Sequence, residues 1–273
     1  MGVASQASVA LENARMHEDM VARERIKRDM QLAKDVQLSF LPRSLPTVES
    51  YEFFAHYEPA LEVGGDYYGF IPLPRDRMVV TVGDVAGKGV PAALLMASLS
   101  SDARFCTVTE PEPATAISKL NDLLVKTAGS MDRFVTLCAI ILDYKQHKAV
   151  IVNAGHMTPL VYRHATGKLE DSTNNDVVGL PLGVAEGYPY EAAEVSLGPG
   201  DCLVTFSDGV SEAMDKNNTQ FGLERIQSAV KQSNAPMNSK AIGERIVKAV
   251  KLFSAGRSQH DDITLVCFGR KLS

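Results

Sequence analysis

The stretch MVVTVGDVAGKGVPAALLMA, residues 78–97, decides the fold, because a buried strand, a glycine-rich turn and a helix follow one another in it. Residues 78–82 are apolar and mostly β-branched, which is typical of a strand covered on both faces. Pro91 suits an early helical position, and good helix formers follow it. The three glycines of the turn permit a positive φ and a close approach to a ligand. The stretch therefore predicts that Asp84 is presented at the end of a strand.

Three kinds of site use a turn of this type. A phosphate-binding P-loop needs four residues between its first glycine and its Gly-Lys pair, followed by Ser or Thr. Here only three residues separate Gly83 from Gly87, and a glycine follows Lys88, so the P-loop interpretation fails. A dinucleotide site fits Gly87, Gly89 and Ala92 as G-x-G-x-x-A, which alone is a weak signal. A metal site, the third alternative, requires further carboxylates at comparable turns.

Length and composition limit the function classes. The 273 residues favour one large domain with an appendage. A net charge of −5 and a pI of about 5.7 do not indicate a nucleic-acid partner. Four widely spaced cysteines without a CxxC pair argue against a zinc or disulfide framework and favour a reducing cytosol. No apolar run approaches the ~18 residues that cross a bilayer, and no signal-peptide core is present. We therefore expect a cytoplasmic protein without a membrane partner.

Residues from about 5 to 40 predict one long helix, because they contain neither Pro nor Gly and are rich in helix formers. Leu41-Pro42 ends it, since the residue before proline is pushed out of the α region. Two basic residues interrupt its heptad stripe, so a self-sufficient coiled coil is not encoded. A helix packed along the following domain and a dimerising or signal-transmitting helix both remain open. We divide the chain into a helical linker, residues 1–44, and a main domain, residues 45–273.

Further elements follow from periodicity and turn residues. The expected strands are 51–59, 67–73, 78–82, 134–142, 148–153, 160–163, 202–206 and 263–268, and the expected helices are 91–107, 113–127, 223–232 and 239–253. The polar segment 211–222 is expected to form a flap, and the loop 179–183 to line or cap the core. His156 is expected to fix a tight turn rather than to bind a metal.

Acidic residues recur at the ends of four apolar strand-like segments, mostly beside glycine. They are Asp66, Asp84, Asp208 and the pair Asp261-Asp262. A single Asp-Gly turn is a routine surface feature. Carboxylates gathered at one rim, however, repel one another unless divalent cations lie between them. Ligands that are all oxygen select hard cations such as Mg²⁺ or Mn²⁺. Two such ions can activate a water for in-line attack on phosphorus, so the pattern predicts phosphoester hydrolysis.

Seven motifs carry a resemblance to a known family. They are VGGDYY at 63–68, GDVAGKGVPAALLM at 83–96, FVTL at 134–137, NAGH at 153–156, GLPLG at 179–183, SDGVSEA at 207–213 and QHDDIT at 259–264. In order and spacing they resemble the metal-dependent protein phosphatases (PPM, 2C-like) and, within these, the bacterial SpoIIE/RsbU branch. The resemblance covers the chain from about residue 35 onward. It implies an α+β fold, an αββα sandwich of two mainly antiparallel sheets flanked by helices, preceded here by the long N-terminal helix.

The resemblance also implies roles for individual residues. Asp84 would bridge two divalent cations, Mn²⁺ or Mg²⁺, and the carbonyl of Val85 would bind one of them. Asp208 and Asp261 would hold the ions directly, and Asp66 would do so directly or through water. Asp84 and Asp208 are the implied catalytic residues.

Three further positions bear on the chemistry. The family's ligand is the first residue of the Asp261-Asp262 pair, so Asp262 is expected to support the ligands without touching the ions. Ala86 departs from the eukaryotic members, which carry a histidine there that is proposed as the general acid. No phosphate-binding arginine is evident, and Lys88 is the basic residue nearest the site in sequence.

The branch implies a substrate and partners. Its typical substrate is phosphoserine or phosphothreonine on a STAS-type anti-sigma-factor antagonist, within a partner-switching cascade. Residues 3–20 resemble the last helix of an upstream sensor domain such as GAF, and the long helix offers a route to a homodimer. Two alternatives remain. A catalytically silent, phosphatase-like binding module would keep the same acids. A dinucleotide-binding oxidoreductase would explain the glycines but not the acids, and it requires alternating strands and helices.

Overall fold

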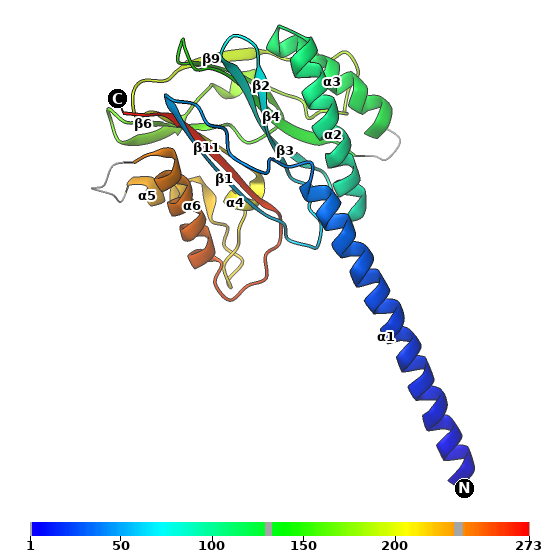
Figure 1. The fold of residues 1–273 in the computed structure, drawn as a ribbon. Coiled ribbons are helices and arrows are strands. Elements are labelled where there is room, and N and C mark those ends of the chain that lie inside the picture. Colours follow the sequence, from blue (N-terminus) through cyan, green and yellow to red (C-terminus); the bar gives the residue numbers. More distant parts are fainter. Residues whose placement is uncertain (1, 129–132, 232–236, 273) are drawn as a thin grey trace.

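The computed structural model describes residues 2–128, 133–231 and 237–272. Two β-sheets pack face to face, and helices cover their outer faces (Figure 1). This confirms the predicted α+β sandwich of two mainly antiparallel sheets preceded by a long helix. It also excludes the alternating parallel architecture that a dinucleotide-binding oxidoreductase requires.

One sheet contains five strands within the described residues. Their order is β1 (Tyr51–Glu58), β11 (Ile263–Arg270), β10 (Cys202–Phe206), β6 (Leu160–Arg163) and β7 (Lys168–Asp171). Every neighbouring pair in this sheet is antiparallel. β1 lies at the edge and pairs only with β11, so the beginning of the domain is held by its last strand.

The second sheet is formed by the middle of the chain. Its strands are β2 (Tyr67–Leu73), β3 (Arg77–Val85), β4 (Val135–Asp143), β5 (Lys148–Ala154) and β8 (Val178–Gly179), with β9 (Ala192–Ser196) paired to β5. Only the β5–β8 pairing is parallel among these ladders. β3 and β4 are buried along nearly their whole length, because the other sheet covers one face and helices cover the other.

Helices form the two outer layers. α2 (Val90–Thr109) and α3 (Pro113–Ala128) pack on the second sheet, while α5 (Gly222–Lys231) and α6 (Ser239–Phe253) pack on the first. The short α4 (Asp208–Ser211) follows β10, and a 3₁₀ turn, η2 (Asn175–Val177), precedes β8. The core between the sheets is aromatic and aliphatic and includes Phe53, Phe70, Val80, Ile140, Val266 and Phe268.

The first helix, α1 (Gly2–Leu38), extends away from the rest of the chain (Figure 1). Its side chains from residue 11 to 29 are exposed, whereas Gln37 and the following Leu41 are buried. The predicted long helix is confirmed, and only its last turns contact the main body. Among the described residues, no helix combines the length and apolarity that crossing a bilayer requires.

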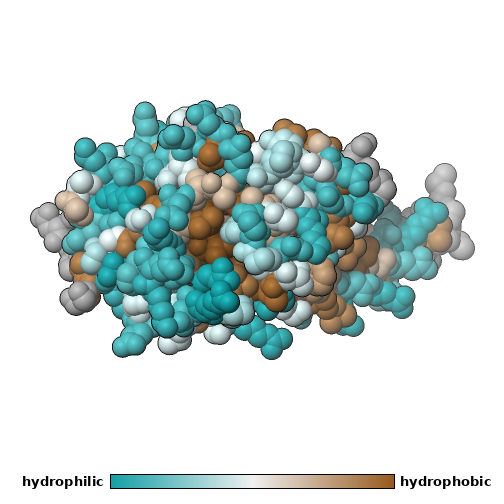
Figure 2. Space-filling view, turned by 90° about the horizontal axis from the view of Figure 1, so that it is seen from above, coloured by the Kyte–Doolittle hydropathy of each residue, from teal (hydrophilic) through white to brown (hydrophobic). Residues whose placement is uncertain are grey.

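Seen from above, the face of the main body is mostly hydrophilic, and a strip of hydrophobic residues lies between two more polar regions (Figure 2). All four cysteines lie in the described part of the chain, and each is buried and free of a disulfide, as the absence of a disulfide framework in the sequence predicted.

Three strands were not predicted. β7 has one apolar residue in four and lies at a sheet edge, and β9 joins the side of β5 with alternating exposure. β8 spans only two residues. Hydrophobic periodicity does not detect such segments, because it reports burial rather than backbone pairing. The predicted helix 223–232 corresponds to α5, and its residue 232 lies outside the described residues, as do residues 1 and 273.

Candidate metal centre

The acidic turns that the sequence indicated meet at one edge of the sandwich. Asp66 immediately precedes β2, and the pairing of Tyr67 with Gly83 places it beside Asp84 near the end of β3. Asp208 begins α4 directly beyond β10. The adjacent strand β11 starts just after Asp261 and Asp262. Both sheets therefore contribute carboxylates to the same place.

The charges of these carboxylates oppose one another. Asp66 is 1% exposed, and its burial followed by the charge of Asp84 raises its pKa well above the usual range. Burial, and then the charges of the other acids led by Asp208, raise the pKa of Asp84 to about 7. Burial and the neighbouring Asp261 likewise raise the pKa of Asp208. Such a cluster stores unfavourable electrostatic energy that bound cations would relieve.

Asp262 has a different task from its neighbours. Its carboxylate accepts hydrogen bonds from the backbone N–H of Ala60 at 2.7 Å, of Gly65 at 2.6 Å and of Asp66 at 3.3 Å. A side chain on Gly64 would collide with this carboxylate, which explains one glycine of the pair. Asp262 thus shapes the backbone that presents Asp66.

Helix α1 reaches the same turn. The Gln37 side chain donates through Nε2 to the Gly64 carbonyl, and the Gly64 N–H donates to Gln37 Oε1 at 3.1 Å. Gln37 is buried. The sequence interpretation missed this residue, because its partner lies 27 positions away and a glutamine in a charged helix carries no local signal.

The two residues before β4 bind the glycine-rich turn after β3. The Ala86 N–H donates to the Phe134 carbonyl at 2.9 Å, and Arg133 Nη1 donates to the Ala86 carbonyl at 2.7 Å. Gly87 has φ 103°, and a side chain there would collide with the Arg133 guanidinium. The Val85 carbonyl faces Gly65, since a Cβ on Gly65 would lie 3.0 Å from it. Arg133 is a second residue that sequence reasoning missed.

One cation contacts the cluster. Lys88 Nζ lies 3.0 Å from Asp261 Oδ2 and also donates to the His260 carbonyl. Within the described part of the chain, no other Lys, Arg or His forms an ion pair with these five acids. The positive charge of Lys88 also lowers the pKa of Asp208, but the upward effect of burial on that pKa is larger.

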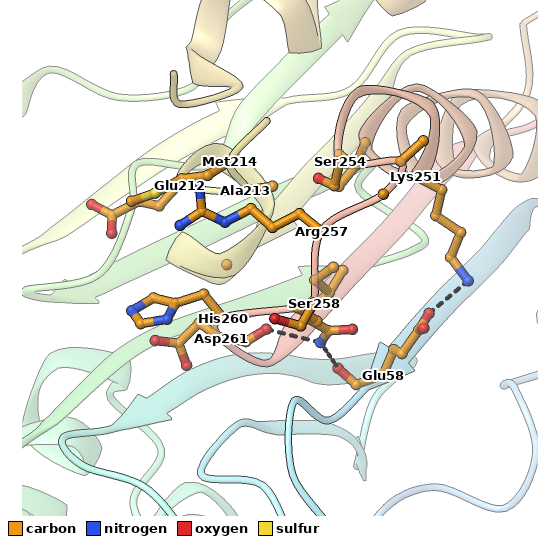
Figure 3. Close-up of a pocket in the computed structure, with 16 residues that line it drawn as sticks. Glu58, Glu212, Ala213, Met214, Lys251, Ser254, Arg257, Ser258, His260 and Asp261 are labelled. Carbon is orange, nitrogen blue, oxygen red and sulfur yellow. Dashed lines mark hydrogen bonds and ion pairs between the residues drawn. The ribbon is translucent and has the colours of Figure 1, made fainter. Parts of the chain in front are cut away.

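A cavity of about 350 Å³ adjoins the cluster (Figure 3). It runs from Gly209 and Asp261 to the C-terminal end of α6. One wall is tied together by Gln259, whose Nε2 donates to the carbonyls of Glu58 and Asp261, both at 2.8 Å. Lys251 pairs with Glu58 at 2.6 Å. The cavity therefore opens beside Asp261 at the edge of the acidic cluster.

His156 lies in the turn that follows β5. Its backbone N–H donates to Asn153 Oδ1 at 2.8 Å, and Asn153 Nδ2 donates back to the His156 carbonyl at 3.1 Å. Its Nδ1 is 2.9 Å from Thr136 Oγ1, and burial lowers its pKa to about 4. The predicted tight turn is present, and the Asn153 side chain closes it through the backbone of His156. The imidazole itself joins this turn to Thr136 of β4, the strand partner of Asp84.

The donor set has the chemistry of a hard-cation site. Its predicted members, Asp66, Asp84, Asp208, Asp261 and the carbonyl of Val85, offer oxygen alone, which suits Mg²⁺ and Mn²⁺. As they stand, no three His, Cys, Asp or Glu side chains of the described residues are arranged to hold an ion. The residue types and their mutual repulsion fit divalent cations.

Residues 74–271 match the Stage II sporulation protein E (SpoIIE) family. The chain belongs to the SpoIIE family. Among curated SpoIIE-like relatives it is 28% identical to phosphoserine phosphatase RsbU of Bacillus subtilis (strain 168), over 90% of this chain and 71% of RsbU. It is 26% identical to protein IcfG of Synechocystis sp. (strain PCC 6803), over 89% of this chain but only 41% of IcfG.

Solved structures of other SpoIIE-like and PP2C domains share the fold. The SiaA-PP2C domain of Pseudomonas aeruginosa aligns with a TM-score of 0.76 at 21% identity, over 91% of this chain and 98% of that one. The RsbU and RsbW domains of Rv1364c from Mycobacterium tuberculosis align with a TM-score of 0.69 at 24% identity. That match covers 85% of this chain and 63% of the other, less than two thirds of its length. RsbX, crystallised with magnesium, aligns with a TM-score of 0.62 at 14% identity, over 84% of this chain and 99% of that one.

Proposed function

We propose that this chain is a metal-dependent protein serine/threonine phosphatase. The observation that carries the proposal is the convergence of carboxylates from both sheets into a partly buried, mutually repelling cluster, in a chain of the SpoIIE family. Such a cluster has little structural use, since it destabilises the fold on its own. It is useful where positive charge is to be bound beside a reacting phosphate.

The proposed roles of the residues are those that the family resemblance implies, and the gathering of the acids at one edge supports them. Asp84 is the proposed bridge between two divalent cations, Mn²⁺ or Mg²⁺, and Asp208, Asp261, Asp66 and the Val85 carbonyl are the remaining ligands. When bound, the ions supply the positive charge that offsets these acids and an activated water for attack on phosphorus. The protein's own part is to hold the acids in place, as Asp262 and Gln37 do through the backbone of the turn before β2.

The proposed substrate is phosphoserine or phosphothreonine on a regulatory protein of the STAS-type anti-sigma-factor antagonist class, in a cytoplasmic partner-switching pathway. The support is the 28% identity to a protein named phosphoserine phosphatase. The cavity beside Asp261 adds support, because it offers a protein substrate a surface that a small phosphoester does not need.

We also propose that residues 1–44 form a linker and residues 45–273 the phosphatase domain. In this division α1 connects an upstream sensor domain to the site and provides a homodimer contact. The Gln37–Gly64 hydrogen bonds support it, because they join the end of α1 to the turn carrying Asp66. Deleting the residues up to about 30 tests this role. Unchanged activity and an unchanged oligomeric state would exclude it.

The experiment that tests the function is hydrolysis of p-nitrophenyl phosphate with Mn²⁺, Mg²⁺ or EDTA. We expect Mn²⁺-dependent turnover that EDTA abolishes and that Asp84→Asn and Asp208→Asn each reduce at least about a hundredfold. Asp176→Asn, which removes an exposed carboxylate outside the cluster, is the matched control. Wild-type protein that binds Mn²⁺ without turnover would instead favour the catalytically silent binding module.

A further inference from the structure

Lys88 occupies an unusual position for a surface lysine. It stands between two glycines whose φ angles are 103° and 76°, in the turn that follows Asp84 and Val85. Its ammonium reaches across to the segment before β11, where it lies 3.0 Å from Asp261 Oδ2 and donates to the His260 carbonyl. The turn that follows Asp84 thus places the ammonium of Lys88 beside Asp261, another proposed ligand.

Both carboxylate oxygens of Asp261 are engaged. Oδ2 pairs with Lys88, and Oδ1 accepts the Asp262 N–H at 2.9 Å. A divalent cation that binds Asp261 through Oδ2 therefore approaches an oxygen that already pairs with the ammonium, and the two positive charges repel each other there. Asp84 and Asp208 form no ion pair with any described residue, so binding to them carries no such competition.

We propose that Lys88 competes with the divalent cation for Asp261 and thereby sets the metal affinity of the site. The inference rests on the proposed metal centre. The ammonium offsets part of the negative charge when the ions are absent and gives way when they bind. The affinity for a divalent cation at Asp261 is consequently lower than the carboxylates alone would give.

The size of the effect is limited by solvent. The side chains of Lys88 and Asp261 are 39% and 37% exposed, and ion pairs at such exposure are weak. Removing the ammonium also removes a nearby like charge that repels the incoming ion. We expect the Lys88→Met variant to bind Mn²⁺ about two- to fivefold more tightly than the wild type.

Calorimetric titration of Mn²⁺ into chelator-treated protein measures this directly. Lys119→Met is the matched control, because Lys119 is 41% exposed and pairs with Glu110 at 2.7 Å away from the cluster. We expect it to retain the wild-type affinity. Lys88→Arg keeps the charge and should stay close to wild type, whereas Lys88→Gln should behave like Lys88→Met and replaces it if that variant folds poorly. Affinity that is unchanged or weaker in both neutral variants would overturn the inference.

A second readout needs no metal. In EDTA, a double-mutant cycle of Lys88→Met and Asp261→Asn on thermal unfolding should give a favourable coupling, and an additive cycle would contradict the ion pair. These measurements are separate from catalysis. If the neutral Lys88 variants bind Mn²⁺ more tightly but the wild type has no phosphatase turnover, the competition is supported and the proposed function is refuted. If the wild type turns over substrate but the variants keep the wild-type Mn²⁺ affinity, the proposed function is supported and the competition is refuted.

Discussion

Replacing Asp84 by asparagine should stabilise the metal-free protein while it abolishes activity. In the folded chain the pKa of Asp84 is raised from 3.8 to about 7, first by burial and then by the neighbouring acids. A raised carboxyl pKa means that the folded state disfavours the ionised form. The penalty is absent below pH 3.8, grows between pH 3.8 and 7, and is fully present above pH 7.

The magnitude follows from this difference. At about 1.4 kcal/mol for each pH unit, a pKa of about 7 in place of 3.8 corresponds to at most about 4 kcal/mol at pH 8. The coupling between the acids reduces what one substitution recovers. Even half of this free energy would raise the Tm by about 4–8 °C at roughly 2–4 °C per kcal/mol.

The assay is scanning calorimetry in EDTA at pH 5 and pH 8, which suits a chain without tryptophan. Asp84→Asn should unfold at a higher temperature than the wild type at pH 8, with a smaller gain at pH 5. Saturating Mn²⁺ should reverse the order, because the wild type gains stability from the bound ions. A variant that is less stable than the wild type at pH 8 in EDTA, or a gain that does not depend on pH, would refute the electrostatic reasoning.

Two further perturbations test the surroundings of the site. Asp262→Ala leaves three backbone N–H groups without their acceptor and should cost about 2–4 kcal/mol of unfolding free energy with or without Mn²⁺. Denaturant unfolding measures this loss, and a loss below about 1 kcal/mol would contradict the proposal that Asp262 shapes the turn. His156 is buried with a pKa lowered from 6.5 to about 4, so the unfolded chain binds the proton more tightly. The contribution of this histidine to stability should therefore fall as the pH drops from 6.5 to 4, in the opposite direction to the effect of Asp84. The loss should reach about 3 kcal/mol, and His156→Gln should abolish this part of the pH dependence in unfolding at pH 7 and pH 4.5, whereas an unchanged pH dependence would assign it to other groups.

The sequence predicted those features of the fold that depend on local pattern. The strand, turn and helix of residues 78–97 were predicted because burial on both faces, glycine and helix formers leave distinct signals. The meeting of Asp66, Asp84 and Asp208 was predicted because each follows or precedes an apolar strand at an end. The hairpin between β2 and β3 brings Asp66 and Asp84 together, whereas Asp208 joins them from the other sheet.

Contacts between distant segments were beyond prediction. The Asp262 carboxylate bonds to backbone about 200 positions earlier in the chain, and Gln37 bonds to Gly64 from a different layer. No periodicity or composition encodes these pairs, because they depend on how the two sheets and α1 are placed in space. The Lys88–Asp261 ion pair belongs to the same class.

The pairing of the edge strand β1 with β11 has a consequence for synthesis of the protein. Among the described strands β1 pairs only with β11, and Asp262, just before β11, holds the turn carrying Asp66. The ribosome delivers these two parts at the beginning and at the end of the domain. While β11 is still inside the ribosome, the nascent chain cannot assemble the carboxylate cluster, so the site is completed only after β11 has emerged.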